Sequence, residues 1–301
     1  MTDQPSLHKR FIGLSSPMLP EETNEEPVLK ELQGIRALVY DFYGTLFISG
    51  VGDIGIDDAR PDTKTFSEAL KSSGIQITDK QAGAEGFKIY NEVIEQKVNE
   101  MKSDGNPNPE PDIRIIWERV LDRMFKSNLI EIPQKSYPAE QVAVEFEARM
   151  NAIWPMPEAV ETLAWFKNRN MLQGIISNSQ FYTPVALEAL AGKSIEQLGF
   201  DMRLLHWSYT EKIKKPGLAF YKSFLKKLHR VDPSIKPTEV LYIGNDMLKD
   251  VFPAVSTGFK TALFAGDKRS LKWRKDDPRC VNLEPDLVIT SFSQLIKCIK
   301  L

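Results

Sequence analysis

Short apolar runs alternate along the chain with segments whose apolar residues recur at helical spacing. Four runs rich in β-forming residues each lead into a small or polar residue, and they lie at Leu38–Tyr40, Gly174–Ile176, Val240–Ile243 and Leu287–Ile289. Thr261–Phe264 is a further candidate. Continuous apolar runs of this length are typical of strands that are buried on both faces of a sheet.

Amphipathic segments separate these strands. Pro157–Asn168 begins with a proline and a glutamate, which suit a first helical turn, and it carries its apolar residues toward one face. Leu218–His229 repeats the helical spacing over three turns. Strands that alternate with helices predict an α/β fold: a doubly wound, mostly parallel, Rossmann-like sheet covered on both faces.

The stretch from residue 57 to residue 154 breaks this rhythm and reads as almost wholly helical. Helices are expected over Ala82–Met101, Asp112–Phe125 and Ala139–Ile153, with a turn at residues 105–109. An all-helical block inside an α/β chain indicates an inserted cap domain. The core is then formed by residues 35–56 and 155–301.

Residues 1–34 read as an N-terminal extension. The segment Pro17–Pro27 holds three prolines and four glutamates, which disfavours regular structure. We expect a flexible or surface-laid arm, and the sequence assigns no function to it.

Composition narrows the class of protein. The chain has 301 residues, is 42% hydrophobic, and carries 39 basic against 41 acidic residues. This balance offers no basic excess for nucleic acid and no polybasic segment for a membrane. No apolar run is long enough to span a bilayer, and residues 1–10 lack the apolar core of a signal peptide, so we expect a cytoplasmic protein. Two separate cysteines and three scattered histidines argue against a zinc site.

The residues that carry chemistry follow the predicted strands, where open α/β sheets bind their ligands. They form four motifs: Asp41-Phe42-Tyr43-Gly44-Thr45, Ser177-Asn178-Ser179, Lys214-Lys215-Pro216-Gly217, and Gly244-Asn245-Asp246 with Asp250 four residues later. This ordered set resembles the haloacid dehalogenase-like hydrolases. The resemblance extends from about residue 35 to the C-terminus, and many members carry a helical cap between the first two motifs.

The resemblance implies a nucleophile and a metal. Asp41 corresponds to the family nucleophile, since a carboxylate can attack phosphorus or an activated carbon. Mg²⁺, which prefers hard oxygen ligands, would be held by Asp41, Asp246 and the main-chain carbonyl of Tyr43. Asp250 would hold a metal-bound water or orient Lys215.

The resemblance also assigns the groups that surround a phosphate. Ser177 would hydrogen-bond phosphoryl oxygens, and Lys215 would balance the charge on the transferring group. Thr45 and Asn178 are assigned to cofactor binding. Lys214 competes with Lys215 for the lysine role, but the following Pro216 matches the Lys-Pro pair of the family.

One position departs from the phosphatase pattern. Phosphatase members carry a second aspartate two residues after the nucleophile, as general acid and base, and here this position is Tyr43. Dehalogenase members carry tyrosine there, because carbon–halogen cleavage needs no protonated leaving group. They also place an arginine just beyond the first motif, and Gly50–Asp58 contains none; Arg60 is a distant candidate.

The fourth motif favours metal chemistry, because Asp246 and Asp250 together suit Mg²⁺. We therefore expect a Mg²⁺-dependent phosphatase that acts on a small organic phosphate. The alternatives are a metal-independent haloacid dehalogenase and a catalytically weakened, metabolite-binding member of the superfamily. The oligomeric state stays open.

The cap would act as a lid, hinged at Gly50–Gly55 and at Pro155–Pro157. It could also supply the acid that the first motif lacks. Its candidate residues are Glu92, Glu95 and Glu110.

Overall fold

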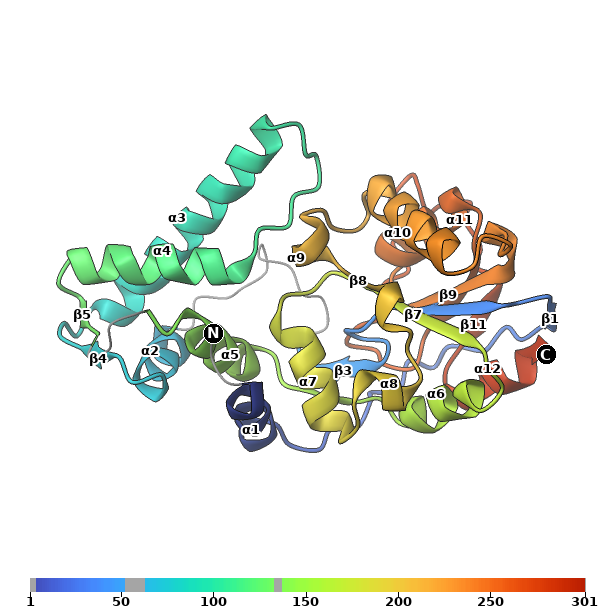
Figure 1. The fold of residues 1–301 in the computed structure, drawn as a ribbon, viewed down its shortest axis with the longest axis horizontal. Coiled ribbons are helices and arrows are strands. Elements are labelled where there is room, and N and C mark those ends of the chain that lie inside the picture. Colours follow the sequence, from blue (N-terminus) through green and yellow to red (C-terminus); the bar gives the residue numbers. More distant parts are fainter. Residues whose placement is uncertain (1–3, 52–62, 133–136, 301) are drawn as a thin grey trace.

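The computed structural model describes residues 4–51, 63–132 and 137–300. Its centre is a six-stranded sheet in which all neighbouring strands are parallel, in the order β11-β10-β9-β2-β7-β8 (Figure 1). The strands are β2 (Ala37–Tyr40), β7 (Leu172–Ser177), β8 (Leu205–Trp207), β9 (Val240–Gly244), β10 (Lys260–Phe264) and β11 (Leu287–Ile289). All five predicted strands are confirmed, and the edge strand β8 is an addition.

Side chains of β2 alternate between two apolar layers. Ala37 and Val39 face the cluster that contains Phe220 and Phe224 of α10 (Leu218–Val231). Leu38 belongs to the opposite layer, with apolar residues of α6 (Ala159–Lys167), α7 (Tyr182–Ala191) and α12 (Ser293–Cys298). Helices therefore cover both faces of the sheet, which confirms the doubly wound α/β prediction.

Shorter elements complete the core. They are α8 (Ile195–Leu198), α9 (Ser208–Glu211), α11 (Phe252–Thr257), η2 (Met202–Leu204), η3 (Pro237–Glu239) and the π-helical turn η4 (Met247–Val251). Within the part of the chain that the structure describes, no helix is long and apolar enough to cross a membrane.

The cap is built from α2 (Thr63–Ser72), α3 (Ala82–Ser103), α4 (Ile113–Lys126) and α5 (Ala139–Met150). Its core is aromatic: the ring of Trp117 lies 5.0 Å from that of Tyr90, 5.3 Å from Phe66 and 5.5 Å from Phe146. The prediction of a helical cap is confirmed with one correction. β4 (Gln76–Ile77) and β5 (Ile130–Glu131) form a small antiparallel pair, because the segments that follow α2 and α4 lie side by side.

The two connections between core and cap lie side by side. β3 (Phe47–Ser49) pairs antiparallel with β6 (Ile153–Pro155), and the N–H of Gly50 donates to the carbonyl of Ala152 at 2.8 Å. The helix expected to reach Ile153 therefore ends at Met150. Both predicted hinges adjoin this pair, although residues 52–55 of the first lie outside the described residues, as does Arg60.

Over its described residues the N-terminal segment lies along the core, and it contains a helix that the sequence did not predict. It begins with α1 (Gln4–Leu14), which packs on α5 and α7 and buries Leu7 and Phe11 (Figure 1). Thr23 then donates a hydrogen bond to the carbonyl of Ala265, and β1 (Leu32–Gln33) pairs with β12 (Ile299–Lys300). The segment rich in proline and glutamate has no regular structure, as expected, and it is laid along the core.

Candidate active site

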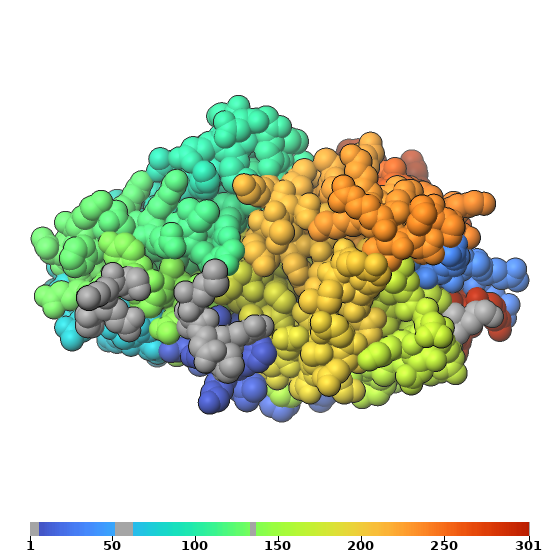
Figure 2. Space-filling view, viewed as in Figure 1, coloured from blue at the N-terminus to red at the C-terminus, as the bar shows by residue number. Residues whose placement is uncertain are grey.

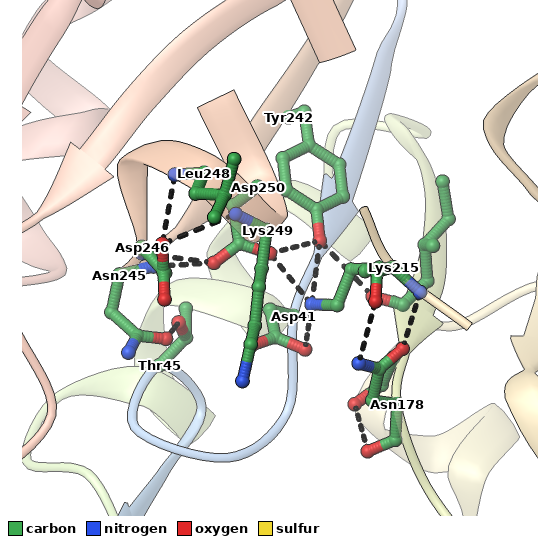
Figure 3. Close-up of polar contacts among 12 residues, drawn as sticks. Asp41, Thr45, Asn178, Lys215, Tyr242, Asn245, Asp246, Leu248, Lys249 and Asp250 are labelled. Atoms are coloured by element: carbon green, nitrogen blue, oxygen red, sulfur yellow. Dashed lines mark hydrogen bonds and ion pairs between the residues drawn. The ribbon is translucent and has the colours of Figure 1, made fainter. Parts of the chain in front are cut away.

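A cleft lies at the carboxyl ends of β2, β7 and β9, the sheet edge that the motifs indicated. Its lining residues are Asp41, Tyr43, Asn178, Lys215, Asn245, Asp246, Lys249, Asp250, Ser270 and Lys272. Figure 3 shows the carboxylates of Asp41 and Asp250 beside the ammonium of Lys215, with Asp246 next to Asp250. The folded chain thus brings members of all four motifs together.

Asp41 follows β2 directly. Its N–H donates to the carbonyl of Ile243 at 2.8 Å, which fixes the start of the loop against β9. The residue is 6% exposed, and it lines the cleft. Gly44 turns the loop with φ +75°, and a Cβ there would lie 2.5 Å from the Cβ of Ser270. Glycine is therefore required for both the backbone conformation and the close approach.

Lys215 bridges two carboxylates. Its Nζ lies 2.7 Å from Oδ1 of Asp41 and 2.6 Å from Oδ1 of Asp250. Burial acts to lower the pKa of this amine, but the two ion pairs outweigh burial and raise its pKa. Lys214 does not share these ion pairs, and its main-chain N–H bonds the carbonyl of Asn108. These contacts favour Lys215 over Lys214 for the lysine role.

Asp250 is fully engaged by the protein. Its Oδ1 accepts from Tyr242 at 2.9 Å as well as from Lys215, and its Oδ2 accepts from the main-chain N–H groups of Asn245 and Asp246, each at 3.0 Å. Burial raises its pKa, while the Lys215 ammonium acts in the opposite direction. Of the two roles expected for Asp250, these contacts favour the orientation of Lys215.

Asp246 is held by a residue that the sequence did not point to. Its Oδ1 caps η4 by accepting from Leu248 N at 2.8 Å and Lys249 N at 3.1 Å. The guanidinium of Arg274 contacts both carboxylate oxygens, with Nη2 2.6 Å from Oδ2 and Nε 3.2 Å from Oδ1. Arg274 lies 28 residues further along the chain, in a loop after β10 that matches no motif.

Magnesium fits the donor chemistry of this cleft. Asp41, Tyr43 and Asp246 line it together, and they offer carboxylate and main-chain oxygens. Among the described residues, no group of three or more His, Cys, Asp or Glu could hold a metal ion, but Mg²⁺ keeps several waters and needs only one or two carboxylates. Because Arg274 occupies both oxygens of Asp246, a cation would have to displace part of that ion pair.

Tyr43 is a poor base at neutral pH. Its hydroxyl lies 3.0 Å from Oγ1 of Thr183. Burial and, to a lesser extent, the charge of Glu147 raise the pKa of this phenol well above its ordinary value. The tyrosine at the position where phosphatase members carry an aspartate therefore changes the proton chemistry of the site.

The side chains of three other predicted site residues form hydrogen bonds within the protein. Ser177 is fully buried and its Oγ lies 3.4 Å from the carbonyl of Asn178. Thr45 donates to Oδ1 of Asn245 at 3.0 Å. The side chain of Asn178 bonds the main chain of Lys215: it accepts from the N–H at 2.7 Å and donates to the carbonyl at 3.4 Å. Of these three residues, only Asn178 lines the cleft. Their expected roles toward phosphate and cofactor stay predictions.

Comparison with known proteins supports the fold. A 2-haloacid dehalogenase from Pseudomonas syringae superposes with a TM-score of 0.54 at 17% identity, covering 88% of this chain and 97% of the other. This chain has the haloacid dehalogenase-like fold. The resemblance carried by the four motifs is thereby confirmed at the level of fold.

Two weaker similarities accompany this one. A phosphatase of the same superfamily from Thermococcus onnurineus has a TM-score of 0.46 at 15% identity, over 87% of this chain and 97% of that one. A Schizosaccharomyces pombe protein, named only as an uncharacterised hydrolase, is 23% identical over 231 residues, 75% of this chain and 88% of its own. No family model matches the chain. The reaction must therefore be argued from the cleft.

Proposed function

We propose that this protein is a hydrolase that uses Asp41 as a carboxylate nucleophile on small organic phosphates. The observation that carries the proposal is the buried Asp41–Lys215–Asp250 array, open to a cleft that Lys249 and Lys272 also line. Lysines around a carboxylate favour an anionic substrate, and they reduce the repulsion between that substrate and the attacking oxygen.

The proposed reaction has two steps. An oxygen of Asp41 attacks phosphorus, the bond from phosphorus to the leaving oxygen breaks, and the electron pair departs with that oxygen. Water then attacks the aspartyl phosphate, which releases inorganic phosphate and restores the carboxylate. Since Oδ1 of Asp41 already bonds Lys215, Oδ2 is the attacking atom, and the ammonium stays beside the developing charge.

Asp41, Asp246 and the main-chain carbonyl of Tyr43 would hold Mg²⁺, which would neutralise charge on the substrate phosphate. Replacement of Asp41 by Asn should abolish turnover of an aryl phosphate without unfolding the protein, as monitored by circular dichroism. A variant that retains a tenth of wild-type kcat would contradict the nucleophile assignment.

The environment of Tyr43 limits the leaving groups that the proposed substrate can carry. A phenol with a strongly raised pKa is a weak proton donor, and general acid catalysis is typically worth about 10²–10⁴-fold. The protein should therefore favour substrates whose leaving groups need no proton, such as acyl and aryl phosphates. In a series of aryl phosphates, kcat/KM should fall steeply as the pKa of the phenol rises. A flat series would indicate an acid elsewhere in the cleft.

A haloacid dehalogenase is the second candidate, because Tyr43 stands at the acid position and because cationic residues besides Lys215 line the cleft. This reaction would release chloride from 2-chloropropionate in the presence of EDTA. Chloride release with no turnover of any phosphate would replace the first proposal by this one.

A further inference from the structure

A loop of the cap is bonded to the core segment that carries Lys215. The main-chain N–H of Lys214 donates to the carbonyl of Asn108 at 2.9 Å, and that of Glu110 donates to the carbonyl of Lys212 at 3.2 Å. The side chain of Asn106 donates to the same Lys212 carbonyl at 2.6 Å. Figure 2 shows the teal end of the cap in contact with the amber surface of the core. The cap is thus docked immediately beside the third motif.

Glu110 is the buried centre of this docking. It is 6% exposed. Its Oε1 accepts from Nε2 of Gln180 at 2.8 Å, and its Oε2 accepts from Oγ of Ser208 at 3.2 Å. In the described part of the chain no lysine or arginine forms an ion pair with it. A buried carboxylate without a cation is costly, so an apolar residue would serve simple packing better.

The hydrogen bonds continue from Glu110 toward the cleft. Oγ of Ser208 accepts from the main-chain N–H of Ser179 at 2.8 Å. Ser179 adjoins Asn178, whose side-chain amide bonds both the N–H and the carbonyl of Lys215. A contiguous path therefore runs from a cap carboxylate to the lysine that contacts the proposed nucleophile.

We propose that Glu110 is a positioning residue that couples docking of the cap to the placement of Lys215. When the cap is docked, Glu110 fixes Ser208 and Gln180, and the loop at residues 178–180 then holds the main chain of Lys215. A displacement of about 1 Å in a group that acts on the transition state can cost about 10²-fold in rate. The part of this inference that concerns catalysis rests on the proposed function.

The kinetic test compares Glu110→Ala with Glu118→Ala, which removes an exposed carboxylate from α4. Glu110→Ala should lower kcat at least tenfold and change KM less than twofold, whereas Glu118→Ala should change neither. Ser208→Ala should lower kcat similarly, and the double variant should be no worse than either single one, because both act through one path. Equal kcat values for Glu110→Ala and the control would overturn the inference.

Glu110→Gln provides a rescue, since its amide can accept from Gln180 and donate to Ser208. It should restore kcat to within threefold of wild type. If Glu110→Ala does not fold, Ser208→Ala carries the test, because it removes a single hydroxyl.

Hydrogen exchange provides a readout that needs no substrate. The amides of Lys214 and Lys215 should exchange at least tenfold faster in Glu110→Ala or Ser208→Ala than in wild type. Exchange within β9 should stay unchanged. Unaltered protection at these two amides would refute the coupling even if the protein hydrolyses phosphates. Faster exchange in a protein without any turnover would retain the coupling and remove the proposed function.

Discussion

The buried carboxyl of Glu110 makes the stability of the protein depend on pH. Burial raises its pKa from 4.5 to about 7, against smaller opposing effects of Lys214, Ser208 and Gln180. A shift of this size corresponds to about 3 kcal/mol between protonated and ionised forms. The group binds its proton more tightly in the folded chain than in the unfolded one. Its contribution to stability is therefore complete below pH 4.5 and is lost as the pH rises through about 7.

Glu110→Gln removes this titration while it keeps the size and a hydrogen-bonding amide. We expect the unfolding free energy of wild type, minus that of the variant, to fall by about 2.5 kcal/mol between pH 5 and pH 8.5. The steepest part should lie between pH 5 and pH 7. Urea unfolding at half-unit pH intervals measures this difference, with the slope of each transition checked for constancy.

Other groups cancel in this comparison. His206, whose pKa burial lowers to about 4, and Glu147, whose pKa burial raises, titrate in both proteins. Lys214 and Lys249 lie near enough to act on Glu110, and both are present in the wild type and in the variant. A difference that stays constant within about 0.5 kcal/mol would refute the reasoning, because it would mean that Glu110 is ionised in the folded protein at pH 5.

Three further variants test other parts of the structure. Phe11→Ala should destabilise the protein by about 3–5 kcal/mol in urea unfolding, because Phe11 is 1% exposed, whereas the matched Ile12→Ala, at a position 57% exposed, should cost less than about 0.5 kcal/mol. Gly44→Ala should lower both stability and kcat, because the added methyl group clashes sterically and the backbone has a positive φ. Gly34→Ala is the control: φ is +73° there and no atom lies within 4 Å of the added Cβ, so this variant measures the effect of the φ strain alone. Arg274→Gln should tighten Mg²⁺ binding about tenfold in calorimetry, since the guanidinium competes for a metal-binding carboxylate; unchanged or weaker binding would contradict that competition.

The pattern of apolar residues predicted the fold because the strands are short and buried on both faces. Val240–Ile243 and the other predicted runs have no polar interruption, and every residue of β9 is buried. β8 was missed because His206 interrupts its apolar run, although this side chain bonds the carbonyl of Phe220 instead of meeting solvent. The helix α1 was not predicted because its amphipathic pattern is weak. Its buried apolar residues are Leu7 and Phe11, which pack against helices distant in sequence.

The motifs predicted the carboxylates of the cleft but not the charges that hold them. A spacing such as that of Asp246 and Asp250 follows from one strand and one helical turn, so it can be read locally. Arg274 reaches Asp246 from a loop with no regular structure, and only the folded chain brings them together. This matters for the chemistry, since a carboxylate that caps η4 and bonds a guanidinium is a weaker metal ligand than one exposed to water. The affinity of the cleft for a cation should therefore be governed by Arg274 as much as by the aspartates that the sequence revealed.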